Sequence, residues 1–281
     1  MKKLTFTIAI KAPKEKVWYS LWDDENYENW TSVFCQGSQT ISDWKQGSKI
    51  YFLDPSGAGM SSRINSSQPF ETLSFKHIGE MKNFKELPAT KETESWSGAE
   101  ERYDLTEKDG ITTLTASVEI TESHADYFNK TFPKALQKVK EIAEDPTHTI
   151  TVRTSTKESL EKAWDYFTKP EHIVNWCFAS EDWHCPKATN DLKTGGTFST
   201  TMASKDGAMS FDFEGTYSEV IPLKKYTYTI EDGRKVTLKF NVIDNTVIIT
   251  ENFEPENSNP LEMQRDGWQA ILDNYKKYLE Q

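Results

Sequence analysis

Apolar and polar residues alternate along residues 3–11, and this pattern is the first structural signal in the chain. Strict alternation places the apolar side chains on one face, as in a half-buried β-strand. The period then changes, because Pro13 suits a helix N-terminus and Val17, Trp18 and Leu21 share one face at helical spacing. The chain is therefore predicted to open with a strand followed by a helix.

The pattern continues through the first half of the chain and is then repeated. For the first half it predicts a short helix over 23–30, strands near 32–42, 48–54, 58–66, 71–78, 96–107 and 111–121, a polar loop over 79–95 and a helix over 123–144. For the second half it predicts a strand over 148–154, helices over 156–167 and 170–176, five or six strands between 182 and 254, and a helix over 260–280. Asp145-Pro146 is the predicted linker, because proline ends a helix and favours extended geometry before it.

The repeat is also visible residue by residue. Leu4–Trp30 aligns with Ile150–Trp176 without a gap, at a constant offset of 146 positions, and the offset places Trp18 on Trp164. We interpret this pair of tryptophans as packing anchors between helix and sheet. A self-match with so long a period indicates two whole domains rather than a solenoid of short repeats.

The predicted domains are 1–145 and 146–281, each close to a common domain size. Each is predicted to be α+β, with a curved antiparallel sheet wrapped round a long C-terminal helix, since the inner face of such a sheet and the apolar stripe of such a helix bury each other. Strand parity supports this fold in the second half, where one face carries Phe198, Thr200, Met202, Phe211, Phe213, Tyr217, Tyr226, Tyr228, Val236, Leu238 and Phe240.

Composition excludes several classes of partner. The 281-residue chain has 44 acidic and 33 basic residues, and its net charge of −11 repels phosphate backbones and anionic membrane surfaces. No apolar run reaches the ~18 residues of a membrane span, and the alternating N-terminal segment does not have the pattern of a signal peptide. We therefore expect a cytoplasmic protein with no nucleic-acid partner and no membrane span.

The second half resembles a known family through three segments. These are Pro170-Glu171-His172 with Trp176, Asp191-Leu192-Lys193-Thr194-Gly195-Gly196 with Phe198, and Phe213-Glu214-Gly215-Thr216-Tyr217-Ser218-Glu219-Val220-Ile221-Pro222. They are similar to the activator-of-heat-shock-protein-90-ATPase-like group of the SRPBCC (START-like) superfamily, whose fold is the helix-grip. The first half is similar to the same group through Trp96-Ser97-Gly98-Ala99-Glu100 and Phe132-Pro133-Lys134-Ala135-Leu136.

The two halves differ where the second is most like the family. Ser62 and Ile64 stand where Gly215 and Tyr217 align, so we expect two cavities that are not equivalent. The resemblance implies a hydrophobic cavity, and the superfamily includes lipid carriers, aromatic-polyketide cyclases and co-chaperones. The fold alone therefore does not decide the activity.

A ligand cavity is predicted between the sheet and the C-terminal helix of the second half. The abundance of aromatic side chains, including nine tryptophans, indicates large and rigid walls. The predicted ligand-binding residues are Trp176, Phe198, Met202, Phe213, Tyr217, Tyr228, Phe240 and Trp268. The alternative is that these side chains fill the space as ordinary core.

His77 and Glu101 are the candidate catalytic residues of the first half. Each occupies an inward position of its predicted strand where an apolar residue is expected. If these strands pair antiparallel, the two side chains become cross-strand neighbours, and a carboxylate beside an imidazole can act as an acid/base pair. The alternative is a solvated histidine at a strand end and a glutamate displaced by a bulge at Gly98.

No metal, cofactor or covalent nucleophile is predicted. His172, Cys177, His184 and Cys185 form a group of possible ligands, but the group lacks the close pairs of a zinc site, and the three cysteines of the chain are too few for a disulfide framework. A nucleophile elbow is also missing from the sequence. A partly exposed loop explains this group better.

Three functions remain open. The first is non-enzymatic binding of a small hydrophobic or lipid-type ligand in the cavity. The second is a co-chaperone-like protein-interaction module, which the family resemblance suggests. The third is a cyclase or hydrolase that uses His77 and Glu101.

Overall fold

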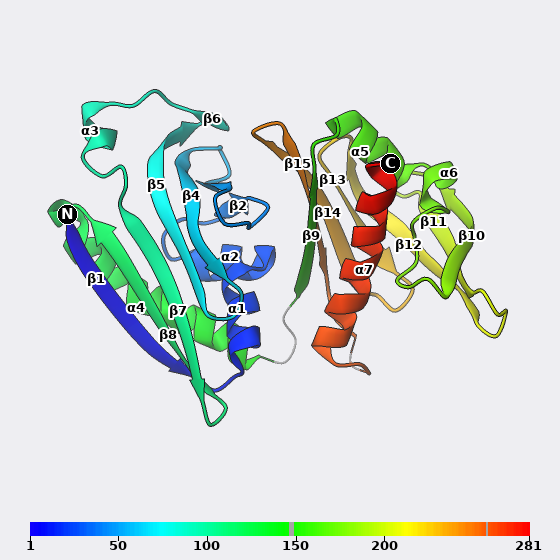
Figure 1. Cartoon of the computed structure of the whole chain (residues 1–281), viewed down its shortest axis with the longest axis horizontal. Helices are drawn as coiled ribbons and strands as arrows, with labels where there is room; N and C mark the ends of the chain where they lie inside the picture. Colours follow the sequence, from blue (N-terminus) through cyan, green and yellow to red (C-terminus); the bar gives the residue numbers. More distant parts are fainter. Residues whose placement is uncertain (146–148, 257) are drawn as a thin grey trace. The chain divides into compact units, whose positions relative to one another are not determined.

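The chain forms two compact units, Met1–His148 and Thr149–Gln281 (Figure 1). The computed structural model describes residues 1–145, 149–256 and 258–281. Pro146 of the predicted linker lies outside the described residues, and the domain boundary assigned there stays a prediction. Within the described residues, no helix is both long and apolar enough to cross a membrane.

The first unit is an antiparallel sheet with one long helix and several short ones. Its elements are β1 (Lys2–Ile10), α1 (Lys14–Trp22), α2 (Asp24–Thr31), β2 (Gln39–Ile41), β3 (Lys49–Leu53), β4 (Gly59–Gln68), β5 (Thr72–Lys82), β6 (Lys85–Glu86), α3 (Lys91–Glu94), β7 (Glu100–Lys108), β8 (Ile111–Ile120), the 3₁₀ turn η1 (Glu122–His124) and α4 (Ala125–Glu144). The strand order is β1-β8-β7-β5-β4-β3-β2, with β6 paired to β5.

The second unit repeats this plan. Its elements are β9 (Ile150–Thr156), α5 (Leu160–Thr168), α6 (Pro170–Ile173), β10 (Trp183–Asn190), β11 (Thr197–Ser204), β12 (Ser210–Ile221), β13 (Lys225–Ile230), β14 (Lys235–Ile243), β15 (Thr246–Phe253) and α7 (Leu261–Leu279). The strand order is β10-β11-β12-β13-β14-β15-β9. Read from its first strand, each sheet therefore has the same order of strands.

One long helix packs on each sheet and closes the core. Helix α4 packs against β1 and helix α7 against β9 (Figure 1). The apolar stripe of each helix is buried with the inner face of its sheet in one cluster per unit. This confirms the predicted fold class, two helix-grip domains in tandem with antiparallel sheets.

The repeated tryptophans have matching roles. The indole Nε1 of Trp30 donates to the Leu21 carbonyl at 2.9 Å, and that of Trp176 donates to the Tyr166 carbonyl at 3.0 Å. Each hydrogen bond ties the first helix of the unit to a tryptophan further along the chain, which lies within α2 in the first unit and just after α6 in the second. The sequence repeat thus reproduces a packing detail as well as the strand order.

Two predicted segments of the first unit differ from the structure. The strand predicted near 32–42 is reduced to β2, because α2 and the turns after it occupy residues up to 38. The polar loop predicted over 79–95 contains strand and helix, because β5 continues to Lys82 and forms a hairpin with β6. Asn83 and Phe84 both have positive φ, 49° and 62°, which suits a two-residue hairpin turn.

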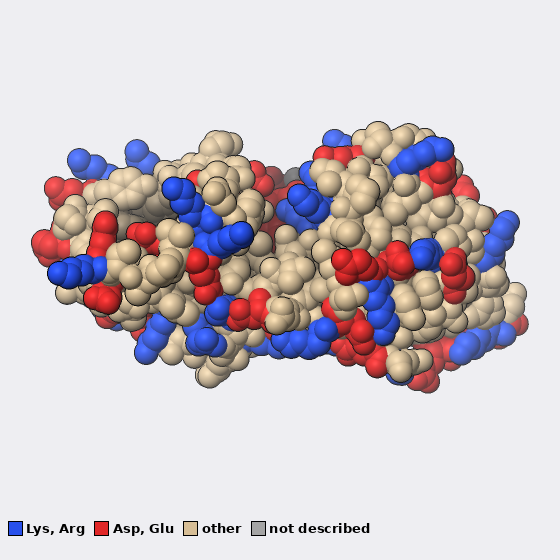
Figure 2. Space-filling model, turned by 90° about the horizontal axis from the view of Figure 1, so that it is seen from above, with Lys and Arg blue, Asp and Glu red and all other residues tan. Residues whose placement is uncertain are grey.

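Charged side chains of both signs are scattered over the surface that Figure 2 displays. Figure 2 shows Lys and Arg interspersed with Asp and Glu over the displayed face of each unit. This distribution agrees with the absence of a long basic block from the sequence. It gives no electrostatic reason to expect a polyanionic partner.

Candidate functional site

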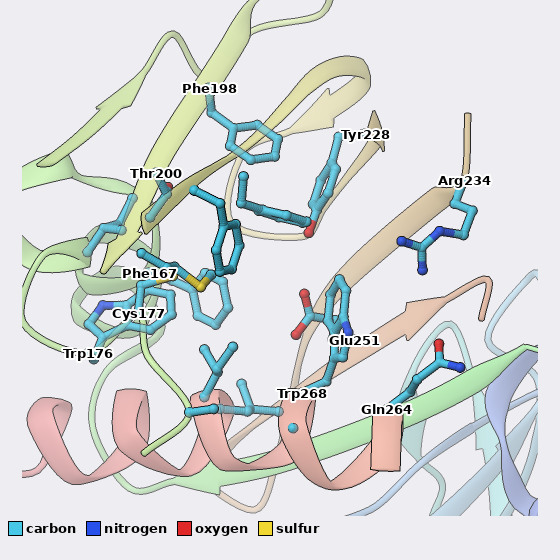
Figure 3. A pocket seen from close by; sticks show the side chains of 18 of the residues that line it. Phe167, Trp176, Cys177, Phe198, Thr200, Tyr228, Arg234, Glu251, Gln264 and Trp268 are labelled. Carbon is cyan, nitrogen blue, oxygen red and sulfur yellow. The ribbon is translucent and has the colours of Figure 1, made fainter. Parts of the chain in front are cut away.

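A cavity of about 420 Å³ lies in the second unit between the sheet and α7 (Figure 3). Strands β11, β12, β13 and β15 form one side, and α7 forms the other. Seven of the eight predicted ligand-binding residues line it: Trp176, Phe198, Met202, Phe213, Tyr217, Tyr228 and Trp268. Their role in binding a ligand remains a prediction.

Phe240 is the exception among the eight, because it does not line the cavity. Its ring packs edge-on against Trp164 at 5.0 Å and Phe167 at 5.8 Å. Both partners belong to α5, and this helix covers the inner face of β14 at that point. Parity placed Phe240 on the correct face of the sheet, but the face is shared between the cavity and the α5 contact.

A glycine sets the position of one aromatic wall. Phe198 on β11 is paired with Gly215 on β12, and a Cβ added to Gly215 would lie 2.6 Å from the Phe198 ring. The ring therefore lies flat across the neighbouring strand only because residue 215 has no side chain. In this position it packs against Tyr228 at 4.8 Å, and the two rings form a continuous wall.

Glu251 is a buried carboxyl in the cavity wall, and the sequence analysis missed it. It lies on β15 between Leu238 and Val152 of the flanking strands, and only 7% of it is exposed. Figure 3 shows its carboxylate projecting into the cavity, with the Tyr228 hydroxyl pointing toward it. Burial raises the pKa of Glu251 to about 8, although the hydrogen bond from Tyr228 acts in the opposite direction.

A sequence signal for Glu251 was available. Val247, Ile249 and Phe253 belong to the buried core of the second unit, and Glu251 continues the same alternation along the strand. An acidic residue at an inward position of an apolar strand is the pattern that singled out Glu101 in the first half. Applying it to residues 246–253 would have identified Glu251.

Four other polar side chains around the cavity already have hydrogen-bond or ion-pair partners. Tyr217 donates to Asn190 Oδ1 at 2.8 Å, and Arg234 at one end of the cavity forms an ion pair with Asp232 at 2.8 Å. The Gln264 amide on α7 donates to the Asn259 carbonyl at 2.8 Å. These groups thus have partners of their own within the protein, whereas Glu251 lies among the aromatic rings.

The cysteine in this cavity is not activated for nucleophilic attack. Cys177 is buried, and burial, with smaller contributions from nearby Cys185 and Glu251, raises the pKa of its thiol well above the ordinary range. A thiol that stays protonated at neutral pH is a poor nucleophile. The geometry therefore offers no covalent chemistry through Cys177.

The four residues considered for a metal have separate structural roles. His172 stacks on Tyr166 at 3.8 Å, with its Nδ1 at 3.0 Å from the Tyr278 hydroxyl. The Cys185 thiol donates to the Lys187 carbonyl, and His184 lies next to it on β10. In the described part of the chain, no group of three or more His, Cys, Asp or Glu residues is placed to hold a metal ion.

The first unit contains a second cavity, of about 800 Å³, with His77 and Glu101 in its wall. Strands β5 and β7 pair antiparallel, and His77 Nε2 lies 3.5 Å from Glu101 Oε2. The structure thus brings together the two residues that parity had paired. His77 is 8% exposed, and the second oxygen of Glu101 accepts a hydrogen bond from the Tyr103 hydroxyl.

A serine holds the other nitrogen of His77. Ser62 Oγ on β4 lies 2.9 Å from His77 Nδ1, and Ser62 is fully buried. It does not line the cavity, so it fixes the orientation of the imidazole and is not placed to attack a substrate. In the tautomer that carries its proton on Nε2, the side facing Glu101, Nδ1 accepts the hydrogen bond from Ser62.

The strand registers show which positions of the two units correspond. Phe6 aligns with Val152 in the sequence repeat, and their partners on the next strand are Ala116 and Glu251. The first unit therefore has an alanine where the second has its buried carboxyl. An acidic residue at this position is not required by the fold.

The reverse difference occurs two strands further along. Ser62 and Gly215 correspond, and their partners are His77 and Ile230. The pairing of the next two strands shows in the same way that Val236 of the second unit occupies the position of Glu101 in the first. Each unit thus has polar side chains in its cavity at positions where the other is apolar, and the two cavities differ as the sequence comparison predicted.

Two antiparallel sheets, each gripping a long helix over an aromatic cavity, define a tandem helix-grip protein of the SRPBCC type. The chain belongs to the family described as activator of Hsp90 ATPase homolog 1-like protein, whose family model matches residues 11–144 and again residues 157–280.

Several solved structures are similar either to about half of the chain or to all of it. A Cytophaga hutchinsonii protein is 52% identical, covering 47% of this chain and 92% of its own, with a TM-score of 0.43. An Aeromonas hydrophila protein described as AHSA1-like is 34% identical, with coverages of 47% and 92% and a TM-score of 0.44. The di-domain ARO/CYC protein BexL is 11% identical, with coverages of 100% and 99% and a TM-score of 0.43. No curated protein matches the chain.

Proposed function

We propose that the second unit is a non-enzymatic binding domain for a small hydrophobic molecule, held in the cavity between sheet and α7. The observation that supports this most directly is the aromatic cavity of about 420 Å³, a size typical of small-molecule sites. Its walls are preformed, because the aromatic rings pack on one another and on the sheet. The position of Trp268, stacked on Phe253 at 4.2 Å, fixes the α7 side of the cavity.

The cavity is partly open to solvent, because Phe211 and Met263 of its lining are 48% and 64% exposed. A small molecule can therefore enter it from solution. An apolar ligand would release water from the aromatic walls, which favours binding.

Gly267 on α7 provides a direct test of this cavity. It lines the cavity, and a Cβ added there meets no atom within 4 Å. We expect Gly267→Leu to occupy part of the space and to weaken binding of a neutral probe, naphthalenemethanol, by about tenfold or more through steric exclusion. Isothermal titration calorimetry on the full chain measures the effect.

Two further variants make this test specific. Asp266→Leu places the same side chain on the exposed side of α7 and should leave probe affinity unchanged. Gly267→Ala should stabilise the second unit by about 0.5–1 kcal/mol, because alanine restricts the unfolded chain and favours the helix. Equal probe affinity in the wild type and Gly267→Leu would contradict the proposed location of the site.

A second candidate function, acid–base catalysis by the first unit, is favoured by one observation. His77 Nε2 and Glu101 Oε2 lie 3.5 Å apart in the wall of the larger cavity. An imidazole oriented by a carboxylate can move a proton in a hydrolase or cyclase reaction. Ser62 at Nδ1 orients the ring, and the imidazole would exchange a proton with a substrate at Nε2, the nitrogen that faces Glu101.

Hydrolysis of aryl esters tests this second candidate. We expect His77→Gln to reduce turnover of a nitrophenyl ester by about 10²-fold or more if the imidazole is the acid/base group. His184→Gln, in the other unit, is the matched control and should keep full turnover. Equal turnover in the wild type and His77→Gln would exclude hydrolysis by this pair.

The co-chaperone-like alternative is supported by the description of the family alone. It predicts that the chain raises the ATP turnover of a chaperone in the absence of any small molecule. A binding protein instead retains an apolar compound through purification. Native mass spectrometry of the freshly purified chain, beside a chaperone ATPase assay, separates these two functions.

A further inference from the structure

Glu251 occupies a costly position with no structural role in the described parts of the chain. Among the described residues no ion pair involves Glu251, and its hydrogen bond is the one from Tyr228. Burying a carboxyl among apolar groups destabilises a fold unless a partner compensates for the loss of water. The corresponding position in the first unit is Ala116, and the same strand order forms there without an acid.

The groups around Glu251 do not supply the missing positive charge. Tyr226, Tyr228 and Cys177 are the titratable neighbours, and burial raises the pKa of each, so all three are neutral near neutral pH. Of the cationic side chains near the cavity, Arg234 pairs with Asp232, and Arg265 on α7 donates to the Thr151 carbonyl. The titratable neighbours of the carboxyl are therefore neutral, and the one arginine that lines the described cavity, Arg234, is already paired with Asp232.

Aromatic rings surround the space in front of this carboxyl. Tyr228 lies on the sheet side and Trp268 on the helix side (Figure 3). Phe213 meets the Trp268 ring edge-on at 5.9 Å. The faces of such rings attract cations, and an anionic group combined with aromatic faces is a general means of binding an organic ammonium ion.

We propose that the ligand of the second cavity is an apolar amine, positively charged at neutral pH, whose ammonium group is bound by the Glu251 carboxylate and the adjacent aromatic faces. This inference rests on the proposed binding function of the cavity and specifies its ligand class. When the ammonium group binds, the Glu251 proton leaves to bulk water and the resulting ion pair is neutral. The apolar body of the ligand fills the remaining aromatic space.

The proposal predicts a pH dependence with a definite sign. Because Glu251 has a pKa of about 8 in the free protein, the carboxyl is mostly protonated at neutral pH. An ammonium ligand must displace this proton, so its affinity should rise by about tenfold or more from about pH 6 to about pH 8. A neutral ligand of the same shape should show little change.

Three naphthalene probes test the inference on the full chain: naphthylmethylamine, naphthalenemethanol and naphthoate. At about pH 8 we expect the amine to bind about tenfold or more tightly than the alcohol, as measured by calorimetry. Glu251→Gln, which keeps the size and the hydrogen-bonding capacity of the side chain, should remove this preference and the pH dependence. Glu254→Gln, at an exposed position on the same segment, should keep both.

Each outcome separates the inference from the function on which it rests. Retained binding of naphthalenemethanol by Glu251→Gln shows that the variant is folded and that the cavity is intact. Equal affinities of the wild type for amine and alcohol, or tightest binding of naphthoate, would overturn the amine inference and leave the binding function in place. Failure of all three probes to bind would overturn both.

Discussion

Raising the pH from about 5 to about 8 should lower the unfolding free energy of the second unit by an amount on the order of 4 kcal/mol, and Glu251→Gln should abolish most of this loss. Burial raises the pKa of Glu251 from an ordinary value of 4.5 to about 8. Between these two values the folded state holds a proton that the unfolded state releases. The contribution of Glu251 to the unfolding free energy is therefore fully present below about pH 4.5. It declines as the pH rises and is lost above about pH 8.

Several other groups of the unit with shifted pKa values act outside this window. Backbone N–H groups of Ala208 and Ser258 lower the pKa values of Asp206 and Glu256, so these carboxylates affect stability at more acidic pH. Burial raises the pKa of the Tyr275 hydroxyl, which therefore titrates above the window. The difference in pH dependence between the wild type and Glu251→Gln therefore gives the contribution of Glu251 between about pH 5 and pH 8.

Urea unfolding with pulsed hydrogen exchange and mass spectrometry measures this effect, because peptides from the two units are resolved. Glu254→Gln is the matched control, since it removes an exposed carboxylate on the same segment. It should reproduce the wild-type dependence. The same pH slope in Glu251→Gln and the wild type would show that the carboxyl is not the group responsible.

Trp22→Ala should destabilise the first unit by about 3–5 kcal/mol, the usual cost of truncating a buried tryptophan. Trp22 is 3% exposed and lies at the centre of an aromatic cluster. Its ring packs edge-on against Tyr103 at 5.0 Å and Phe75 at 5.6 Å. Both partners lie on the inner face of the sheet, so the loss would remove contacts between α1 and the sheet.

Trp18→Ala, one helical turn earlier, is the matched comparison. Trp18 packs at the edge of the same core and contacts Trp22 and Phe70 at 6.4 and 6.0 Å. We expect a cost of about 1–2 kcal/mol, in the range of ordinary substitutions. Pulsed exchange should show the loss in first-unit peptides and unchanged protection in the second unit. Equal costs for the two tryptophans would contradict the central position of Trp22.

This pair of tryptophans also shows what a sequence repeat cannot reveal. The repeat matched Trp18 with Trp164 and therefore selected Trp18 as the anchor of the first unit. Position 22 corresponds to Thr168 in the second unit, where the hydroxyl donates to the Trp164 carbonyl at 2.8 Å. An alignment of the two halves highlights positions where the residues match. It therefore does not highlight a position that is large in one half and small in the other.

The fold was predictable because two independent periodicities agree. Alternation of apolar residues identified most strands, helical spacing identified the two long helices, and the repeat required the same architecture twice. The hairpin at Asn83 and Phe84 was missed because both residues of β6 are polar and exposed, and on the β5 side Met81 is a single buried apolar residue among polar ones. One buried position is too short a pattern to show alternation.

The sequence predicted which side chains face the inside of each sheet, but it did not determine which of them border the cavity. Parity identifies which side chains point inward, and it correctly brought His77 and Glu101 together across β5 and β7. Parity does not indicate what packs on each inward side chain. Helix α5 packs on Phe240, whereas Tyr228 borders the cavity. Packing of a neighbouring helix depends on contacts far apart in the sequence, which a single strand pattern does not contain.

The exchange of polar positions between the halves has an evolutionary consequence. Ala116 and Glu251 occupy one equivalent place, and His77 and Ile230 occupy another. After duplication, the two copies of this scaffold have diverged at a few inward sites while the strand order has stayed the same. Either copy can acquire a new specificity by substitutions in its own sheet, because the residues that distinguish the cavities are not shared.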